Sequence, residues 1–179
     1  MNVARRKPLT ARLGVVAVGH HTYWEQFPGL RAELTAKVEV LIARLRQHQV
    51  EVVDFGLFDR AEPAYAAIPR LKAADLDLLL VDLVTYATSS TFGVLARQVD
   101  TPMVLVALQP LAAMDYEHAS TRMQLGNDDF CSVPEFAGVA MRMGRRVPDV
   151  VLGMLHGDAQ ADAELAQWCR IAHVLHDLR

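Results

Sequence analysis

The sequence has few of the residues that would place the protein in a specialised structural class. Its 179 residues include 2 cysteines, Cys131 and Cys169, and no short Cys–His metal pattern, which argues against a disulfide scaffold and a zinc site. An excess of one charge is also absent, because 18 Lys and Arg residues stand against 21 Asp and Glu residues. Without a broad basic surface, we expect neither nucleic acid nor an acidic membrane as a partner.

Long hydrophobic runs are absent as well. No run approaches the length of a membrane span, and the run at 13–19 is shorter than a signal-peptide core and is followed by His20 and His21. Together with the low cysteine content, this predicts a protein of the reducing cytoplasm.

Hydrophobic residues make up 52% of the chain, enough for the core of one domain. Residues 1–12 are polar, basic and interrupted by Pro8, so we interpret them as an N-terminal arm and residues 13–179 as a single domain. Short apolar runs bounded by polar residues predict buried parallel strands. The predicted strands are Leu13–Val18, Val50–Phe55, Leu78–Val81, Met103–Leu108 and Pro148–Gly153.

Segments with helical spacing alternate with these strands. Leu30, Leu34, Val38, Leu41 and Leu45 form one apolar stripe, and we expect Arg31, Glu33, Lys37 and Arg44 on the opposite, charged face. Further helices are predicted near Pro63–Ala74, where Pro69 weakens the pattern, at Phe92–Gln98, from Pro134–Glu135 onward, and at Asp158–Leu178. This alternation predicts an α/β fold: a doubly wound, flavodoxin-like or Rossmann-like, parallel five-stranded sheet flanked by helices.

Polar side chains follow several of the predicted strands, and one opens a helix. Ligands of such folds bind outside the carboxyl ends of the strands. We therefore expect a substrate cleft at this edge, where side chains would contact a ligand without doing chemistry. The expected cleft residues are Tyr23, Gln26, Thr85, Gln109, Asp115 and Glu135.

Other polar groups have two readings. The hydroxyls of residues 88–90 either meet a ligand or cap the next helix. His20 and His21 could bind a metal, but adjacent residues in an extended segment point apart, so we predict no metal site. Cys131 has no obvious base nearby in the sequence and reads as a packed thiol.

Several short motifs occur together in a consistent order: the run Thr22–Leu30, Thr85-Tyr86 with Thr88–Ser90, Leu108–Pro110, Met114-Asp115 and Val133–Glu135. By these motifs the chain resembles the N-terminal domain of the L-arabinose isomerase and L-fucose isomerase-like family. It departs from the family at Trp24, where arabinose isomerases have glycine, and at Cys131, near the position of a substrate-contacting histidine.

The resemblance implies a substrate-cleft and assembly domain of an aldose–ketose isomerase. The catalytic and metal-binding residues would lie in later domains of the same protein, so this chain alone should be inactive. The family also implies a divalent ion, usually manganese (Mn2+), for the full-length enzyme, a monosaccharide or polyol substrate, and a homo-oligomer, a trimer or hexamer.

Two alternatives remain open at this point. One is a free-standing sugar- or metabolite-binding module of flavodoxin-like fold. The other is a module that binds a flavin or phosphate, which only the fold and the hydroxyls of residues 88–90 suggest.

Overall fold

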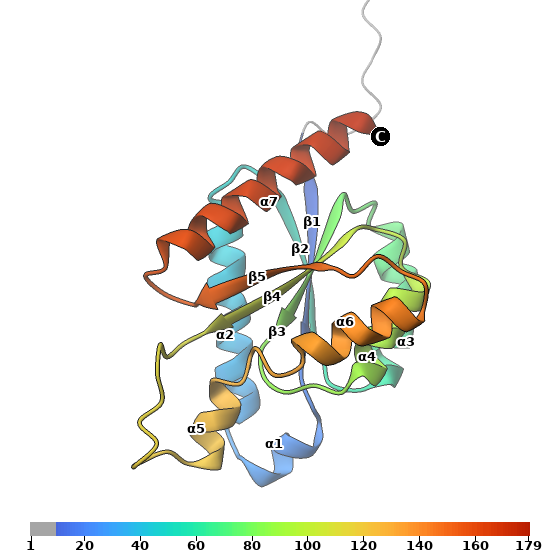
Figure 1. Ribbon diagram of the computed structural model, residues 1–179. Coiled ribbons are helices and arrows are strands. Elements are labelled where there is room, and N and C mark those ends of the chain that lie inside the picture. The colour runs from blue at the N-terminus through green and yellow to red at the C-terminus, as the bar shows by residue number, and fades with distance from the viewer. Residues whose placement is uncertain (1–9) are drawn as a thin grey trace, which may run out of the picture.

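A parallel sheet of five strands forms the centre of the molecule (Figure 1). The computed structural model describes residues 10–179, and the strands lie in the order β2-β1-β3-β4-β5. Their bounds are β1 Arg12–Val18, β2 Glu51–Phe58, β3 Leu78–Leu83, β4 Met103–Gln109 and β5 Asp149–Met154. All neighbouring strands pair in parallel. The predicted doubly wound α/β fold is confirmed.

Helices cover both faces of the sheet (Figure 1). Helices α2 and α7 lie on one face, while α3, α4 and α6 lie on the other. The helices are α1 Thr22–Gln26, α2 Leu30–Arg46, α3 Ala61–Ala73, α4 Ser89–Gln98, α5 Thr121–Gly126, α6 Val133–Arg142 and α7 Ala159–Leu178. Strand β3 is buried along its whole length. Leu78 and Leu80 join the core under α2 and α7, and Leu79 and Val81 join the core on the opposite face.

The helix expected near Pro63–Ala74 is confirmed as α3, and two further helices were not predicted. Helix α3 runs through Pro69 without a break, and Pro69 is exposed, so its ring faces solvent. Helices α1 and α5 were not among the helices predicted from the sequence. Both have at most six residues, which is too short for an apolar stripe to repeat along the helix. Helices of this length are stabilised by tertiary contacts rather than by propensity.

The end of α7 is bound to the start of the central strands. The Asp77 carboxylate accepts hydrogen bonds from the backbone N–H of Arg12 at 2.8 Å and from Arg179 Nη1 at 2.9 Å, and it contacts His176 Nδ1 at 3.0 Å. Arg179 also pairs with Asp75. One buried carboxylate therefore joins β1, β3 and the C-terminal helix.

Residues 1–9, most of the expected arm, lie outside the described residues. Arg12, the last residue assigned to that arm, is the first residue of β1. The assignment of 13–179 to one domain stays a prediction. Within residues 10–179, none of the helices combines the length and the apolar character that crossing a membrane requires.

Candidate functional site

The sheet order places a topological switch point between β1 and β3. From β1 the chain passes through α2 to β2 on one side, and from β3 it passes through α4 to β4 on the other side. Where neighbouring connections diverge in this way, a crevice opens at the carboxyl ends of the two strands, and ligands of such folds bind there. The candidate site therefore lies beyond Val18 of β1 and Leu83 of β3.

A group of rings occupies this switch point, and we call it the switch-point cluster: His20, His21, Tyr23 and Tyr86. The His20 ring lies edge-on to the rings of His21 and Tyr23, at 5.2 Å between centroids in each case. It also meets the Tyr86 ring at 6.2 Å. Because His20 follows β1 and Tyr86 follows β3, these contacts cross the switch point itself. All four side chains are partly buried, so the cluster combines shielded rings with access from solvent.

The electrostatics of the cluster favour neutral groups. Burial, and next the neighbouring His21, lower the pKa of His20, while Asp59 acts in the opposite direction. Burial, followed by the charges of Tyr86, Asp128 and Cys131, raises the pKa of Tyr23. At neutral pH both side chains are therefore uncharged and can act as hydrogen-bond donors or acceptors.

Two buried nitrogen atoms in the cluster lack partners. Nδ1 of His20 and Nδ1 of His21 are inaccessible to solvent and make no hydrogen bond within the described residues. A buried polar atom without a partner is costly and uncommon in folded proteins. The hydrogen-bonding capacity of these two nitrogens is therefore unused in this structure.

Helix α1 is fixed over the end of β1 by Trp24. Trp24 Nε1 donates to Asp59 Oδ2 at 2.7 Å, which ties α1 to the residue that follows β2. The Trp24 ring also covers Gly19, where an added Cβ would lie only 3.1 Å from the ring. Gly19 thus allows the indole to pack on the backbone, and this packing positions His20, His21 and Tyr23.

A buried ionic network lies under the same edge of the sheet. Lys37 Nζ of α2 donates to Asp129 Oδ1 at 2.6 Å, to Val84 O at 3.0 Å and to Gly126 O at 3.1 Å. Burial raises the pKa of Asp129 to about 8 and that of Asp82 to about 7, although the charge of Lys37 opposes both shifts. The network holds the 126–129 segment against the end of β3.

Of the expected cleft residues, Tyr23 belongs to the switch-point cluster, while Thr85, Gln109 and Glu135 bond to the protein backbone. Thr85 Oγ1 donates to Leu125 O at 2.7 Å, and Gln109 Nε2 donates to Asn127 O. Glu135 Oε1 accepts from the N–H of Ser89 at 2.8 Å, so it caps α4 rather than its own helix. These bonds position the loops around the site, and a ligand contact by these residues stays a prediction.

Gln26 and Asp115 are both exposed. Gln26 Nε2 donates to Thr22 O within α1. Asp115 pairs with His118 at 2.8 Å, and their ligand atoms and those of Glu117 lie within 4.8 Å of one another. Exposed acidic groups of this kind are common without a metal, so the trio gives no support for a built site.

The hydroxyls of residues 88–90 do not cap α4 through Thr88. No side-chain cap bond is made at Thr88, and its Oγ1 instead lies 2.8 Å from Ser90 Oγ. The Cys131 thiol lies 3.1 Å from Asp128 O, and burial raises its pKa to about 12. It is therefore a protonated thiol at neutral pH. The residue as a whole is exposed although its sulfur is shielded by Asp128 and Ser132, so the expected packed thiol was wrong.

The prediction for Lys37 was wrong, and Tyr86 was missed. Lys37 is buried with the apolar stripe of α2 instead of lying on the charged face. Its position, three residues after Leu34 and four before Leu41, could have revealed this. Tyr86 offers no such signal, because only the pairing of β1 with β3 brings it to His20.

No protein-family model and no curated protein matches the chain. Among solved structures, the chain is similar to the crystal structure of Est24, a carbohydrate acetylesterase from Sinorhizobium meliloti. The identity is 16% and the TM-score 0.41, with 93% of this chain and 99% of that chain covered. Similarity at this level transfers no activity from one protein to the other.

The expected membership in the L-arabinose isomerase and L-fucose isomerase-like family was wrong. No protein-family model matches the chain, and the solved structure named above is a carbohydrate acetylesterase and not a sugar isomerase, so the expected role as a substrate-cleft and assembly domain of an isomerase was wrong as well. Manganese, later domains of the same protein and the trimer or hexamer were implied by the same resemblance, and they stay untested predictions.

The motif at residues 22–30, which carried much of the resemblance, has a local physical explanation. Trp24 bonds to Asp59, and Gly29 adopts the left-handed backbone conformation, with φ of 86°, that starts α2. A short motif that satisfies one packing contact and one turn can recur in proteins of different function.

Proposed function

We propose that this domain binds a small, uncharged, polyhydroxylated molecule, such as a monosaccharide or polyol, at the switch-point cluster. The observation that carries the proposal is the pair of buried, unpartnered Nδ1 atoms of His20 and His21 at the junction of β1 and β3. Rotation of these partly exposed rings would bring the nitrogens to the hydroxyl groups of a ligand, which can both donate and accept hydrogen bonds.

The character of the cluster supports a neutral ligand. The pKa of His20 is lowered and that of Tyr23 raised, so neither carries a charge at neutral pH. Lys37, the buried cation nearby, is already bound by three acceptors, and it offers little to a phosphate. The rings of Tyr23 and Tyr86 provide the apolar faces against which the C–H faces of sugars pack.

Calorimetric titration with a panel of neutral sugars and polyols, for example D-ribose, L-arabinose and sorbitol, tests the proposal. We expect saturable binding by at least one of them. His20→Ala and Tyr86→Phe should each weaken it about three- to tenfold, because each removes a hydrogen bond worth on the order of 1 kcal/mol. The matched controls are His156→Ala and Tyr65→Phe, which alter exposed residues outside the cluster and should leave the affinity unchanged.

Two results would contradict this function. One is the absence of binding heat for every member of the panel up to tens of millimolar. The other is sugar binding that His20→Ala and Tyr86→Phe leave intact while both variants remain folded.

We place the protein in the cytoplasm as part of the same proposal. Both cysteines are free, and burial raises the pKa of Cys131 to about 12 and that of Cys169 to about 11. Free, protonated thiols are typical of a reducing compartment.

A further inference from the structure

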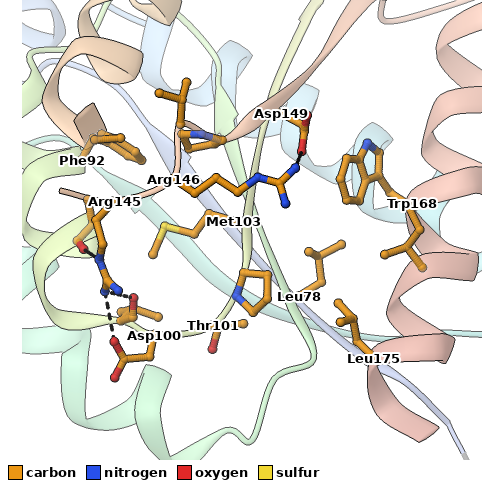
Figure 2. Close-up of a pocket in the computed structure, with 17 residues that line it drawn as sticks. Leu78, Phe92, Asp100, Thr101, Met103, Arg145, Arg146, Asp149, Trp168 and Leu175 are labelled. Atoms are coloured by element: carbon orange, nitrogen blue, oxygen red, sulfur yellow. Dashed lines mark hydrogen bonds and ion pairs between the residues drawn. The ribbon is translucent and has the colours of Figure 1, made fainter. Parts of the chain in front are cut away.

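A second candidate site lies at the opposite edge of the sheet. A pocket of about 310 Å³ opens at the amino ends of β3, β4 and β5, between α7 on one side and α4 and α6 on the other (Figure 2). It does not share a residue with the switch-point cluster. Its lining is mostly apolar and includes Leu78, Phe92, Met103, Val147, Trp168 and Leu175.

The size and lining of this pocket suit a small organic molecule. Its volume lies at the lower end of the range of pockets that bind drug-sized ligands. Phe92 and Leu78 are fully buried, whereas Val147 is 39% exposed, so the pocket reaches from the core to the surface. Aromatic and sulfur-containing side chains, such as Trp168 and Met103, favour contact with an aromatic or aliphatic body.

Two arginines line the pocket, and they differ in how they are held. Arg145 donates to Ala96 O at 2.6 Å and to Val99 O at 2.8 Å, and it pairs with Asp100 at 3.1 Å. These bonds tie the loop after α6 to α4, so Arg145 has a structural role.

Arg146 pairs with Asp149 alone among the described residues, at 3.1 Å. Figure 2 shows its side chain between Met103 and Trp168. The Arg146 side chain is 86% exposed and that of Asp149 51% exposed, and an ion pair so open to solvent is weak. Its guanidinium can therefore exchange Asp149 for another carboxylate, which it would bind through two parallel hydrogen bonds.

We propose that this pocket binds a small organic acid, with an aromatic or aliphatic body inside the pocket and one carboxylate on Arg146. The apolar walls contribute affinity through burial of the body, and Arg146 selects the acid over neutral analogues. Asp149 competes with the ligand for Arg146 and repels its carboxylate. The site does not depend on the function proposed for the switch-point cluster.

Calorimetric titration of the full chain with indole-3-propionate, and with its neutral amide as the matched ligand, tests this inference. We expect the acid to bind about tenfold more tightly than the amide. Arg146→Ala should remove this preference, and Asp149→Asn should strengthen binding of the acid several-fold, while neither variant changes the affinity for the amide. Arg97→Ala, which removes an exposed arginine of α4 outside the pocket, should behave as the wild type.

The location is tested separately. Val147→Phe enlarges an exposed rim residue, so it leaves the core intact, and it should weaken binding of acid and amide alike. In spectra of the ¹⁵N-labelled protein, the indole N–H signal of Trp168 should shift on titration while that of Trp24 should not.

The proposal is overturned if neither ligand binds, if acid and amide bind equally to the wild type, or if Arg146→Ala keeps the preference for the acid. Binding that Val147→Phe leaves unchanged, with no shift of the Trp168 signal, would place the ligand elsewhere and overturn it as well.

Discussion

Lys37 shows how one residue can connect several segments of this fold. Its ammonium group is buried and bonds to the end of β3 through Val84, to Gly126 of α5 and to Asp129. Asp82 adds a second carboxylate near the same cation. Buried charges are tolerated only with partners. The hydrogen bonds of Lys37 therefore hold the 126–129 segment against the sheet.

Replacing Lys37 by Met should destabilise the protein strongly. The apolar stem is kept, but Val84 O, Gly126 O and the Asp129 carboxyl group lose their buried donor together, so we expect the free energy of unfolding at pH 8 to fall by about 3–5 kcal/mol. Urea denaturation measures the change. Lys72→Met, on the exposed face of α3, is the control and should change stability by less than about 0.5 kcal/mol. A similar loss in both variants would contradict the central role of Lys37.

At the scale of an element, the start of α7 depends on Asp158. Its Oδ1 accepts from the N–H groups of Gln160 and Ala161, and its Oδ2 accepts from the N–H of Met154 in β5. The carboxylate sits where an added Cβ on Gly153 would lie 2.4 Å from Oδ2. Gly153 and Asp158 are therefore a matched pair that turns the chain from β5 into α7.

Asp158→Ala should lower the midpoint of thermal unfolding by a few degrees, because an N-cap and a strand contact are lost together. Asp162→Ala removes an acidic residue from the same turn, and only its exposed pair with Arg44 is lost, so it should cost less than about 1 kcal/mol. Thermal or urea unfolding of the two variants decides between them. An equal loss would show that charge near the helix start, rather than the cap itself, is what matters.

The elements also show what the sequence could reveal. All five strands were predictable from short apolar runs, and the clearest run, Leu78–Val81, belongs to β3, which is buried along its whole length. Helices α1 and α5 were not, since they depend on contacts such as that of Trp24 with Asp59. For the candidate site, the rule for strand ends indicated the edge of the sheet and Tyr23, whereas Tyr86 required the pairing of β1 with β3. A ligand contact by either residue stays a prediction.

At the scale of the whole molecule, the buried carboxylates make stability depend on pH. The pKa values of Asp82 and Asp129 are raised to about 7 and about 8 in the folded protein, above the ordinary value of a carboxyl group. The folded state therefore binds more protons than the unfolded state at neutral pH, and stability is lost as pH rises through these values.

We expect the free energy of unfolding to fall by about 1–2 kcal/mol between pH 7 and pH 8.5, which corresponds to roughly one excess proton in the folded state. His20 and Tyr23 do not contribute to the slope in this window. The pKa of His20 lies below its ordinary value of 6.5, and the pKa of Tyr23 lies above its ordinary value of 10.0. Urea denaturation across the window measures the slope. Asp82→Asn should reduce it, and a slope that this variant leaves unchanged would assign the effect to other groups.

The bonds of Asp77 give the fold a particular response to mechanical load. The N–H of Arg12 at the start of β1 and the side chain of Arg179 after α7 meet on the same buried carboxylate. A force that pulls these two points apart therefore loads the contacts of Arg179 with Asp75, Leu76 O and Asp77 before it loads the hydrogen bonds between strands. We expect the C-terminal helix to detach first under tension. The parallel sheet would carry the force only after the contacts of Arg179 with the 75–77 segment had broken.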